Sequence, residues 1–265
     1  MCIEGRHCMG TPLLEDEEHP AFVQNAAGKS PYVLICEHAS NALPKALGSL
    51  GLSADDLARH IAWDIGAAPM AEALAKLIDA PLIAQRYSRL AYDCNRPPES
   101  PDAIPEVSEV FAIPGNCKLT PADRLARIEA IYRPFHRAIE NVLDTRAASA
   151  TPAIVVSLHS FTKVYKSKER GVELGILHDR DMSLASLLIK SFPNVDARLN
   201  EPYGPKDGVL HLLNLHAAPR GLRHAMIEVR NDLIANGRGQ MEWAQRLSVP
   251  LIQAAAKMQQ GEKNG

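Results

Sequence analysis

The stretch PYVLICEHASNALP, residues 31–44, opens with a run of apolar residues and then places Glu37 and His38 side by side before the chain turns. Four further apolar runs occur along the chain, and longer helical patterns separate them. These runs are PLIAQ (81–85), AIVVSL (153–158), VELGIL (172–177) and HAMIEV (224–229). Short buried strands that alternate with helices are typical of an α/β domain with a mostly parallel sheet.

The length and charge of the chain limit its class. A chain of 265 residues is long enough for one large α/β domain with a sizeable core. We assign residues 21–265 to this domain, and we assign residues 1–20, which are acidic and show no periodicity, to a loosely ordered lead-in. The 29 Lys and Arg residues nearly balance the 31 Asp and Glu residues. No global field therefore favours nucleic acid or an anionic membrane as a partner.

The cysteines bear on the cellular compartment. They are five in number, scattered and without any CxxC spacing, which argues against a disulfide framework or a Cys-rich zinc module. The first twenty residues lack the apolar core of a signal peptide, and no apolar run is long enough to span a membrane. We therefore expect a cytoplasmic protein.

Helices are predicted to begin after Ser53, which can act as an N-cap, and at residues 67–78, and the clearest helix begins at Thr120. Thr120 is a typical N-cap, and Pro121 suits the first helical position. Apolar residues at three- and four-residue steps then continue to Val142, and Pro134 should kink this helix. The span 86–116 is rich in proline and shows no periodicity. Loops of that length in compact domains usually carry function or are disordered.

Polar residues stand at the ends of three predicted strands. The first run leads into Glu37 and His38, the run at 153–158 leads into His159 and Ser160, and the last run carries Glu228. The carboxyl ends of neighbouring parallel strands lie along one edge of a sheet, where ligands bind. A carboxylate inside an apolar strand is costly unless it is paired or bound to metal. We therefore expect the two histidines and the glutamate to converge in a catalytic centre.

The residue types at these strand ends suit zinc. Two imidazoles and an oxygen ligand, with one position left open, form the usual catalytic zinc site. Zinc lowers the pKa of bound water toward about 7 and polarises a carbonyl group. Glu228 would then be the general base, which takes a proton from water and passes it to the leaving nitrogen. The other histidines, including His60, are expected to be packing or surface residues.

Five segments occur in a fixed order between residues 31 and 235: ICEHASNALP, AWDIG, RLAYDCNRP, SLHSF and IEVRND. Together they resemble the N-formylglutamate amidohydrolase family, which is similar in fold to the zinc carboxypeptidases and aspartoacylases. The resemblance implies a three-layer α/β/α fold of the phosphorylase/hydrolase type with a mostly parallel mixed sheet. It also implies metal-dependent hydrolysis of the N-acyl bond of a small, acidic N-acyl amino acid. By matching positions it implies that His38 and His159 are zinc ligands and that Glu228 is the base.

The third metal ligand departs from the carboxypeptidase pattern. That pattern has a glutamate three residues after its first histidine, where this chain has Asn41, a poor zinc ligand. We assign the third position to Asp64 in AWDIG and place Asn41 among the residues that bind substrate. Glu37 is the alternative ligand, although adjacent residues on an extended strand point to opposite faces.

Arginines near the predicted centre suit the carboxylate of an N-acyl amino acid. A guanidinium group can donate two parallel hydrogen bonds to a carboxylate. Arg89, Arg96 and Arg230 are the candidates, and Asn95 with Arg96 resembles the Asn-Arg pair that binds the terminal carboxylate in carboxypeptidases. The basic segment KVYKSKERG, residues 163–171, is expected to form a flap beside the centre.

Two other interpretations remain open. In the first, Cys36 or Ser160 is a nucleophile activated by a histidine, although the chain has no GxSxG motif. In the second, the protein is a carboxylate-binding relative that has lost its metal, which Asn41 in the usual glutamate position would suit. Removal of the charge of Glu228 separates these classes, since a general base is essential for turnover but not for binding.

Overall fold

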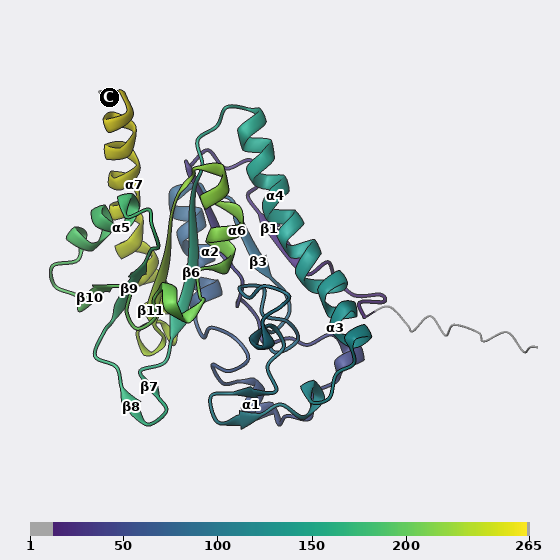
Figure 1. The fold of residues 1–265 in the computed structure, drawn as a ribbon. Helices are drawn as coiled ribbons and strands as arrows, with labels where there is room; N and C mark the ends of the chain where they lie inside the picture. The colour runs from purple at the N-terminus through teal and green to yellow at the C-terminus, as the bar shows by residue number, and fades with distance from the viewer. Residues whose placement is uncertain (1–12, 264–265) are drawn as a thin grey trace, which may run out of the picture.

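Residues 13–263 are described in the structure, a computed structural model, and they form a mixed seven-stranded sheet with helices on both faces (Figure 1). The strand order is β1-β3-β2-β6-β11-β9-β10. The strands are β1 (Ala21–Gln24), β2 (Tyr32–Cys36), β3 (Leu82–Gln85), β6 (Ile154–Phe161), β9 (Leu174–Leu177), β10 (Ala197–Leu199) and β11 (Arg223–Arg230). The fold is the three-layer α/β architecture that the sequence predicted.

Strand direction places four carboxyl ends along one edge of the sheet. β3, β2, β6 and β11 are mutually parallel, whereas β9 lies antiparallel to β11 and β1 lies antiparallel to β3. All five predicted strands are present. β1 and β10 were not predicted, and they are short strands at the two edges of the sheet. Both are only partly buried, so they do not show the continuous apolar run that marks the buried four-residue strands β3 and β9.

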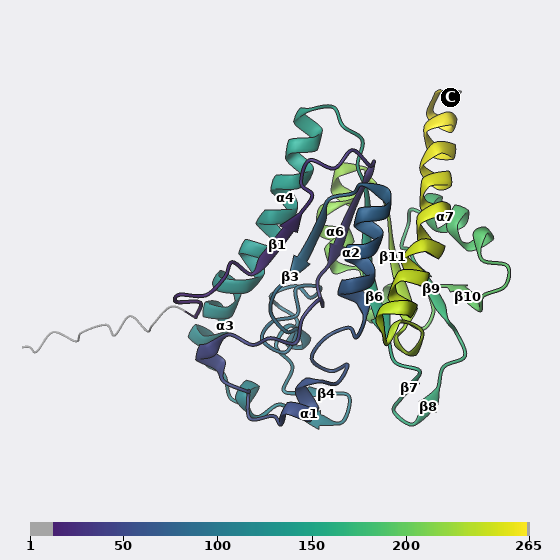
Figure 2. The ribbon, with the colours of Figure 1, turned by 180° about the vertical axis from the view of Figure 1, so that it is seen from behind.

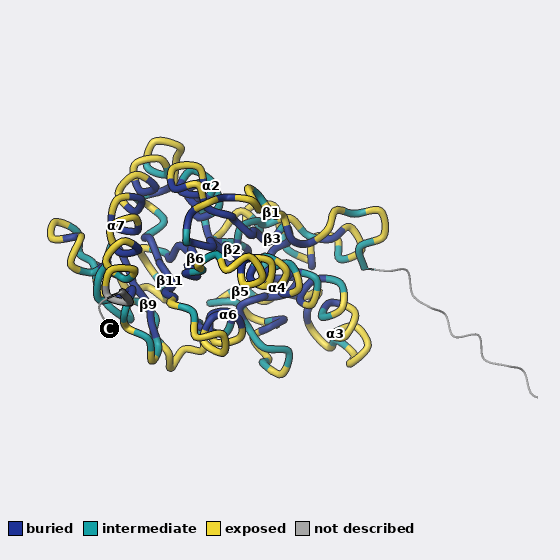
Figure 3. The backbone as a smooth tube through the Cα atoms, turned by 90° about the horizontal axis from the view of Figure 1, so that it is seen from above, coloured by how far each residue is buried: buried dark blue, intermediate teal, exposed yellow. Residues whose placement is uncertain are grey.

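Helices cover both faces of the sheet. Figure 3 shows α2 and α7 on one side and α4 and α6 on the other, and Figure 2 shows α2 and α7 in front of the strands. The α-helices of the described residues are α1 (Ala54–Leu57), α2 (Ala67–Ile78), α3 (Pro121–Arg127), α4 (Arg133–Ala148), α5 (Ser183–Leu188), α6 (His211–His216) and α7 (Gly237–Lys263).

Strand β2 shows why both faces must be covered. Tyr32, Leu34 and Cys36 pack into the apolar cluster on the side of α2 and α7, whereas Val33 and Ile35 pack into the cluster on the side of α4 and α6. All five residues are buried. Burial of each large apolar side chain contributes roughly 1.5–3 kcal/mol. A strand that is buried on both faces reads in the sequence as one continuous apolar run.

The predicted helix starts carry their caps. The hydroxyl oxygen of Ser53 accepts a hydrogen bond from the amide of Asp56, although α1 then continues for only one turn. Thr120 and Asp123 form a reciprocal capping box, with Pro121 at the first helical position of α3. The predicted interruption at Pro134 takes the form of a π-helical turn, Ile128–Tyr132, between α3 and α4. Proline has no amide hydrogen to donate, so the helix widens there.

The long irregular span is ordered by buried polar side chains. The side-chain amide of Asn116 donates to the carbonyls of Leu90 and Pro105. Arg127 of α3 donates in turn to the side-chain oxygen of Asn116 and to the carbonyl of Ala91. These bonds satisfy backbone carbonyls that no regular element pairs. The span also contains a small hairpin of β4 (Val107–Ser108) and β5 (Phe111–Ala112).

The predicted lead-in lies partly outside the described residues. Residues 1–12, with Cys2 and Cys8, are not described. Residues 13–20 lie against the domain, because Glu17 accepts a hydrogen bond from the amide of Lys45 and Glu18 forms an ion pair with Arg86. Within residues 13–263, none of the helices combines the length and apolarity needed to cross a membrane.

Candidate active site

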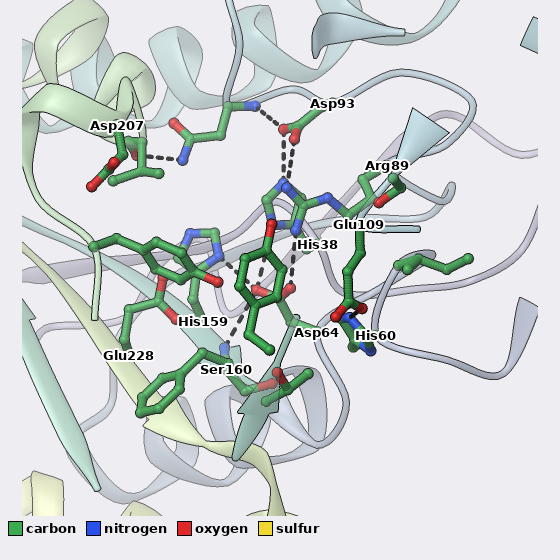
Figure 4. Close-up of a pocket in the computed structure, with 18 of the residues that line it drawn as sticks. His38, His60, Asp64, Arg89, Asp93, Glu109, His159, Ser160, Asp207 and Glu228 are labelled. Carbon is green, nitrogen blue, oxygen red and sulfur yellow. Dashed lines mark hydrogen bonds and ion pairs between the residues drawn. The ribbon is translucent and has the colours of Figure 1, made fainter. Parts of the chain in front are cut away.

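The ends of β2, β6 and β11 meet in one cavity, as the sequence predicted. His38, His159 and Glu228 all line this cavity, whose volume is about 350 Å³ (Figure 4). The ring centroids of the two histidines are 4.9 Å apart. Glu228 is the ladder partner of His159 on the neighbouring strand. The chain turns at residues 37–38 directly after β2, which brings His38 back over the edge of the sheet.

Asp64 lies between the two histidines. Its Oδ2 atom is 2.7 Å from Nδ1 of His159 and 3.3 Å from Nδ1 of His38. One ligand atom from each of these three side chains lies within 4.8 Å of the others. Burial alone would raise the pKa of Asp64, but the positive charge of His38 and hydrogen bonds from both imidazoles outweigh it and hold this pKa well below its usual range.

Local backbone geometry positions Asp64. Its amide donates to the carbonyl of His38, and its own carbonyl accepts from the amide of Ala67 at the start of α2. Gly66 adopts a left-handed φ of 81°, and a Cβ atom there would collide with the carbonyl of Ile234. Only glycine fits this turn without strain. The AWDIG segment therefore has a structural reason for its glycine and places its carboxylate over the sheet edge.

Each histidine is also held from behind by a second carboxylate. Nε2 of His159 lies 3.1 Å from Oε1 of Glu37 and 2.7 Å from the hydroxyl of Ser157. Nε2 of His38 lies 2.8 Å from Oδ1 of Asp93. Both rings therefore turn Nδ1 toward Asp64 and Nε2 toward a supporting carboxylate. Glu37, the alternative third ligand, stands on the far side of His159 from Asp64.

This donor set fits zinc. Two imidazole nitrogens and one carboxylate oxygen match a three-ligand catalytic site with a fourth position open. Carboxylates behind ligating histidines are the usual outer support of such sites, since they fix the ring orientation and the tautomer. The arrangement of His38, Asp64 and His159 therefore meets both requirements, with Glu37 and Asp93 as the supports.

Glu228 is a buried carboxylate with an unused oxygen. Its Oε2 atom has no hydrogen-bond partner among the described residues. Burial raises the pKa of Glu228 to about 7; the imidazoles of His159 and His38 oppose this rise, and the negative charge of Asp64 adds to it. An unpaired buried carboxylate is costly, and such groups are found where function requires them.

The irregular span brings three predicted substrate residues to the cavity. Arg89, Asn95 and Arg96 all line it. Arg89 donates to Asp93 at 2.8 Å and lies 3.4 Å from Asp64, so two carboxylates share its charge.

Asn95 and Arg96 reach the segment that leads into α6. The side chain of Asn95 bonds to the carbonyl of Val209 and to the amide of Leu212. Arg96 donates to the carbonyl of Asp207 at 2.7 Å and forms no ion pair among the described residues. Asn95 therefore orders the cavity wall, while the charge of Arg96 remains available.

Two predicted substrate residues do not line the cavity. Arg230 donates to the carboxylate of Asp232 at 2.7 Å and to the carbonyl of Gly171 at 3.0 Å. It lies two residues beyond Glu228 along β11, where the strand has already passed the cavity. The side-chain amide of Asn41 donates to the carbonyl of Leu57 at 3.0 Å.

The cavity contains residues that the sequence did not single out. His60, expected as a packing or surface residue, lines it, and so do Glu109, Tyr165 and Tyr203. Tyr165 comes from the basic segment 163–171, which folds into a hairpin of β7 (Val164–Tyr165) and β8 (Lys168–Glu169). These residues lie on loops and hairpin tips, whose side-chain directions follow no period in the sequence.

The geometry gives no support to Cys36 or Ser160 as a nucleophile. Cys36 is fully buried in the apolar core, and burial, with the charges of Asp64 and Glu37, raises the pKa of its thiol well above the usual range. A reactive cysteine needs a lowered pKa instead. The hydroxyl of Ser160 donates to the carbonyl of Ile65 rather than to a histidine.

Comparison with known proteins identifies the family of the chain. The sequence profile of the N-formylglutamate amidohydrolase family matches residues 30–235. The crystal structure of a gene product from Agrobacterium tumefaciens is similar with a TM-score of 0.92 and 47% sequence identity, over 94% of this chain and 100% of that chain. The crystal structure of N-formylglutamate amidohydrolase from Ralstonia eutropha is similar with a TM-score of 0.66 and 17% identity, over 92% of this chain and 100% of that chain.

At 17% identity the likeness to the second structure shows the fold alone. A search among curated proteins found no match. The family profile nevertheless spans all three strand ends that form the cavity, from His38 to Glu228. The chain therefore belongs to the N-formylglutamate amidohydrolase family.

Proposed function

We propose that the protein is a zinc-dependent amidohydrolase that cleaves the N-acyl amide, of the formyl type, of a small N-acyl amino acid. One observation carries this proposal. The unpaired Oε2 atom of Glu228 belongs to the same small cavity as the cluster of His38, Asp64 and His159. A free carboxylate beside a potential metal site is the arrangement that amide hydrolysis needs.

His38, Asp64 and His159 would hold the metal ion. Zinc at this site would supply a Lewis acid and would make a nucleophile available from water at neutral pH. Glu37 and Asp93 would keep the Nδ1 atoms of the two histidines directed at the metal by accepting hydrogen bonds from their Nε2 atoms.

Glu228 would move the proton. Burial raises its pKa, and a carboxyl group of raised pKa suits the role of accepting a proton from water and then donating it to the leaving amine nitrogen. The carboxylate sits on β11, the strand next to the one that carries His159, so the rigid sheet fixes its distance from the cluster. Burial excludes bulk water that would otherwise exchange the proton.

Arg96 would bind the α-carboxylate of the substrate. It lines the cavity and donates to the carbonyl of Asp207, and it forms no direct ion pair with a carboxylate of the described residues. Arg89 would act mainly on Asp93 and Asp64, which it contacts directly. Asn95 would hold the wall that carries Arg96, because both of its side-chain groups are bonded to the backbone of residues 209 and 212.

The proposal is tested by formate release from N-formyl amino acids. The zinc-loaded protein should release formate and the free amino acid, and chelation should abolish the reaction reversibly. Protein that binds no zinc even after zinc is added back, and that hydrolyses none of the N-formyl or N-acetyl amino acids, would support the carboxylate-binding interpretation instead. The cytoplasmic location inferred from the cysteines stays a prediction.

A further inference from the structure

The cavity wall on the other side of Asp64 from Glu228 carries a second carboxylate, Glu109. Figure 4 shows Glu109 and His60 together on one side of Asp64, with Glu228 and Asp207 on the other side. Glu109 forms the tip of the β4–β5 hairpin with a left-handed φ of 56°. A substrate whose amide lies over the cluster therefore has Glu109 at one end of its cavity.

The carboxylate of Glu109 is held in place. Its Oε1 atom accepts a hydrogen bond from the amide of Lys166, in the β7–β8 hairpin, at 2.8 Å. Its Oε2 atom lies 2.9 Å from Nε2 of His60, and only 12% of the Glu109 side chain is exposed. Burial lowers the pKa of His60 although Glu109 opposes this, so the neutral imidazole leaves the charge of Glu109 uncancelled at neutral pH.

The cavity has only one free guanidinium group among the described residues that line it. Arg89 is shared by Asp64 and Asp93, whereas Arg96 has no carboxylate partner. One free cation accounts for one carboxylate, the α-carboxylate that every N-acyl amino acid carries. A second carboxylate on the substrate side chain would find no unpaired arginine in the cavity wall.

Other cations near the cavity are held behind its wall. The guanidinium of Arg170 stacks on the rings of Tyr165 and Tyr203 at 4.5 and 4.9 Å and donates to the hydroxyl of Tyr203 at 3.0 Å. The two tyrosines line the cavity and Arg170 does not. The exposed Lys166 side chain places its ammonium group 5.4 Å from the ring of Tyr165, also outside the lining.

We propose that Glu109 is a specificity residue that excludes acidic side chains, so that the substrate is an N-acyl amino acid with one carboxylate and a neutral or, preferably, cationic side chain. This inference rests on the proposed function. It differs from the acidic substrate that the sequence resemblance implied, because the charges that line this cavity leave a negatively charged side chain unpaired beside another carboxylate. Like charges at such a distance repel, and opposite charges attract.

Two matched pairs of substrates test the inference in the zinc-loaded protein. N-formylglutamate carries a negative side-chain charge that N-formylglutamine, of nearly the same shape, lacks. N-formyllysine, acylated at its α-amine, carries a positive side-chain charge that N-formylnorleucine lacks. We expect kcat/KM to be at least about tenfold higher for glutamine than for glutamate, and higher for lysine than for norleucine. A preference of the wild-type protein for N-formylglutamate over N-formylglutamine would overturn the inference while leaving the proposed function intact.

Glu109→Gln provides the residue-level test. Glutamine can still accept from the amide of Lys166, so the hairpin contact is retained while the charge is lost. The glutamine-to-glutamate ratio should fall by at least about fivefold, and the lysine advantage should shrink. Glu106→Gln is the matched control, since Glu106 is exposed on the same hairpin loop and does not line the cavity. Unchanged ratios in Glu109→Gln would refute the role of Glu109.

Binding separates the two proposals if turnover is absent. Calorimetry with the zinc-loaded Glu228→Gln variant gives dissociation constants for the same four compounds without hydrolysis. Tighter binding of N-formylglutamine than of N-formylglutamate, with no hydrolysis by the wild-type protein, would support the specificity of the cavity and reject the hydrolase. Tighter binding of the glutamate compound would reject the specificity itself.

Discussion

Oε1 of Glu37 lies 3.1 Å from Nε2 of His159, on the opposite side of the imidazole ring from Asp64. Asp93 stands in the same relation to His38. Carboxylates in this position fix the ring and raise the basicity of the ligating nitrogen without touching the metal. The geometry thus favours Asp64 as the proposed third ligand and Glu37 as the support of His159, the two residues between which the sequence left the third ligand undecided.

Zinc content distinguishes these tasks. Asp64→Ala should lose the metal on dialysis, as should His38→Ala, because each substitution removes a ligand. Glu37→Gln should keep one zinc per chain but bind it about 10–100-fold more weakly, as measured by competition with a chromophoric chelator. Retention of zinc by Asp64→Ala together with its loss from Glu37→Gln would exchange the two assignments.

Glu228→Gln should bind zinc as the wild type does and lose turnover by at least about a hundredfold, because the amide cannot accept a proton. The measurements are kcat and metal content on the same preparation. Glu106→Gln serves again as the control for a lost surface charge. Activity near the wild-type level in Glu228→Gln would remove this residue as the base.

Arg96→Ala should raise KM by about tenfold or more with a smaller effect on kcat, because a charge-assisted hydrogen bond to the substrate carboxylate is lost. Arg230→Ala is the matched control, since its guanidinium is engaged by Asp232 and Gly171 away from the cavity. Equal losses in the two variants would show that Arg230 also reaches the substrate.

A buried histidine pair should make the fold sensitive to acid. Nε2 of His136 donates to the carbonyl of Cys94, so its Nδ1 accepts from Nε2 of His216 at 2.6 Å. Burial, with the nearby charge of Arg220, lowers the pKa of His216 to about 4. The folded state therefore keeps His216 neutral where the unfolded state, with a pKa near 6.5, takes up a proton.

Above about pH 6.5, His216 is neutral in both the folded and the unfolded state and does not affect stability. As the pH falls from 6.5 toward 4, only the unfolded state takes up the proton, so the folded state loses stability. By pH 5, His216 alone should lower the free energy of unfolding by about 2 kcal/mol. Urea unfolding at pH 7.5 and pH 5 checks this, with His216→Asn as the variant that cannot titrate. Its loss of stability between the two pH values should be smaller than that of the wild type, and an equal loss would contradict the prediction.

The sequence predicted the parts of the fold that have a strong local signal. β2, β6 and β11 are buried on both faces and are therefore visible as apolar runs, and the cap at Thr120 is visible as a residue pattern. The antiparallel direction of β9 was not visible, because an apolar run is the same in either direction.

The residues of the candidate site also fall into those that the sequence could predict and those that it could not. His38, His159 and Glu228 could be grouped because each lies at or near the carboxyl end of a strand of one parallel set. His60 and Glu109 could not, since the loop between α1 and α2 and the tip of a two-residue hairpin set their directions. Arg230 was expected in the cavity from its sequence distance to Glu228, but two further residues of an extended strand carry it past the opening.

The order of the central strands implies that the proposed metal ligands come together only late in folding. Glu37 and Ser157, which meet around His159, are 120 residues apart, and β6 gains its second neighbour only when β11 has been synthesised. Contacts between such distant segments form slowly. Unlike a zinc finger, whose metal organises a short nascent segment, this chain must complete its sheet before the ligands coincide. We expect zinc starvation to leave a folded apoprotein in the cell, with cooperative thermal unfolding retained after chelation.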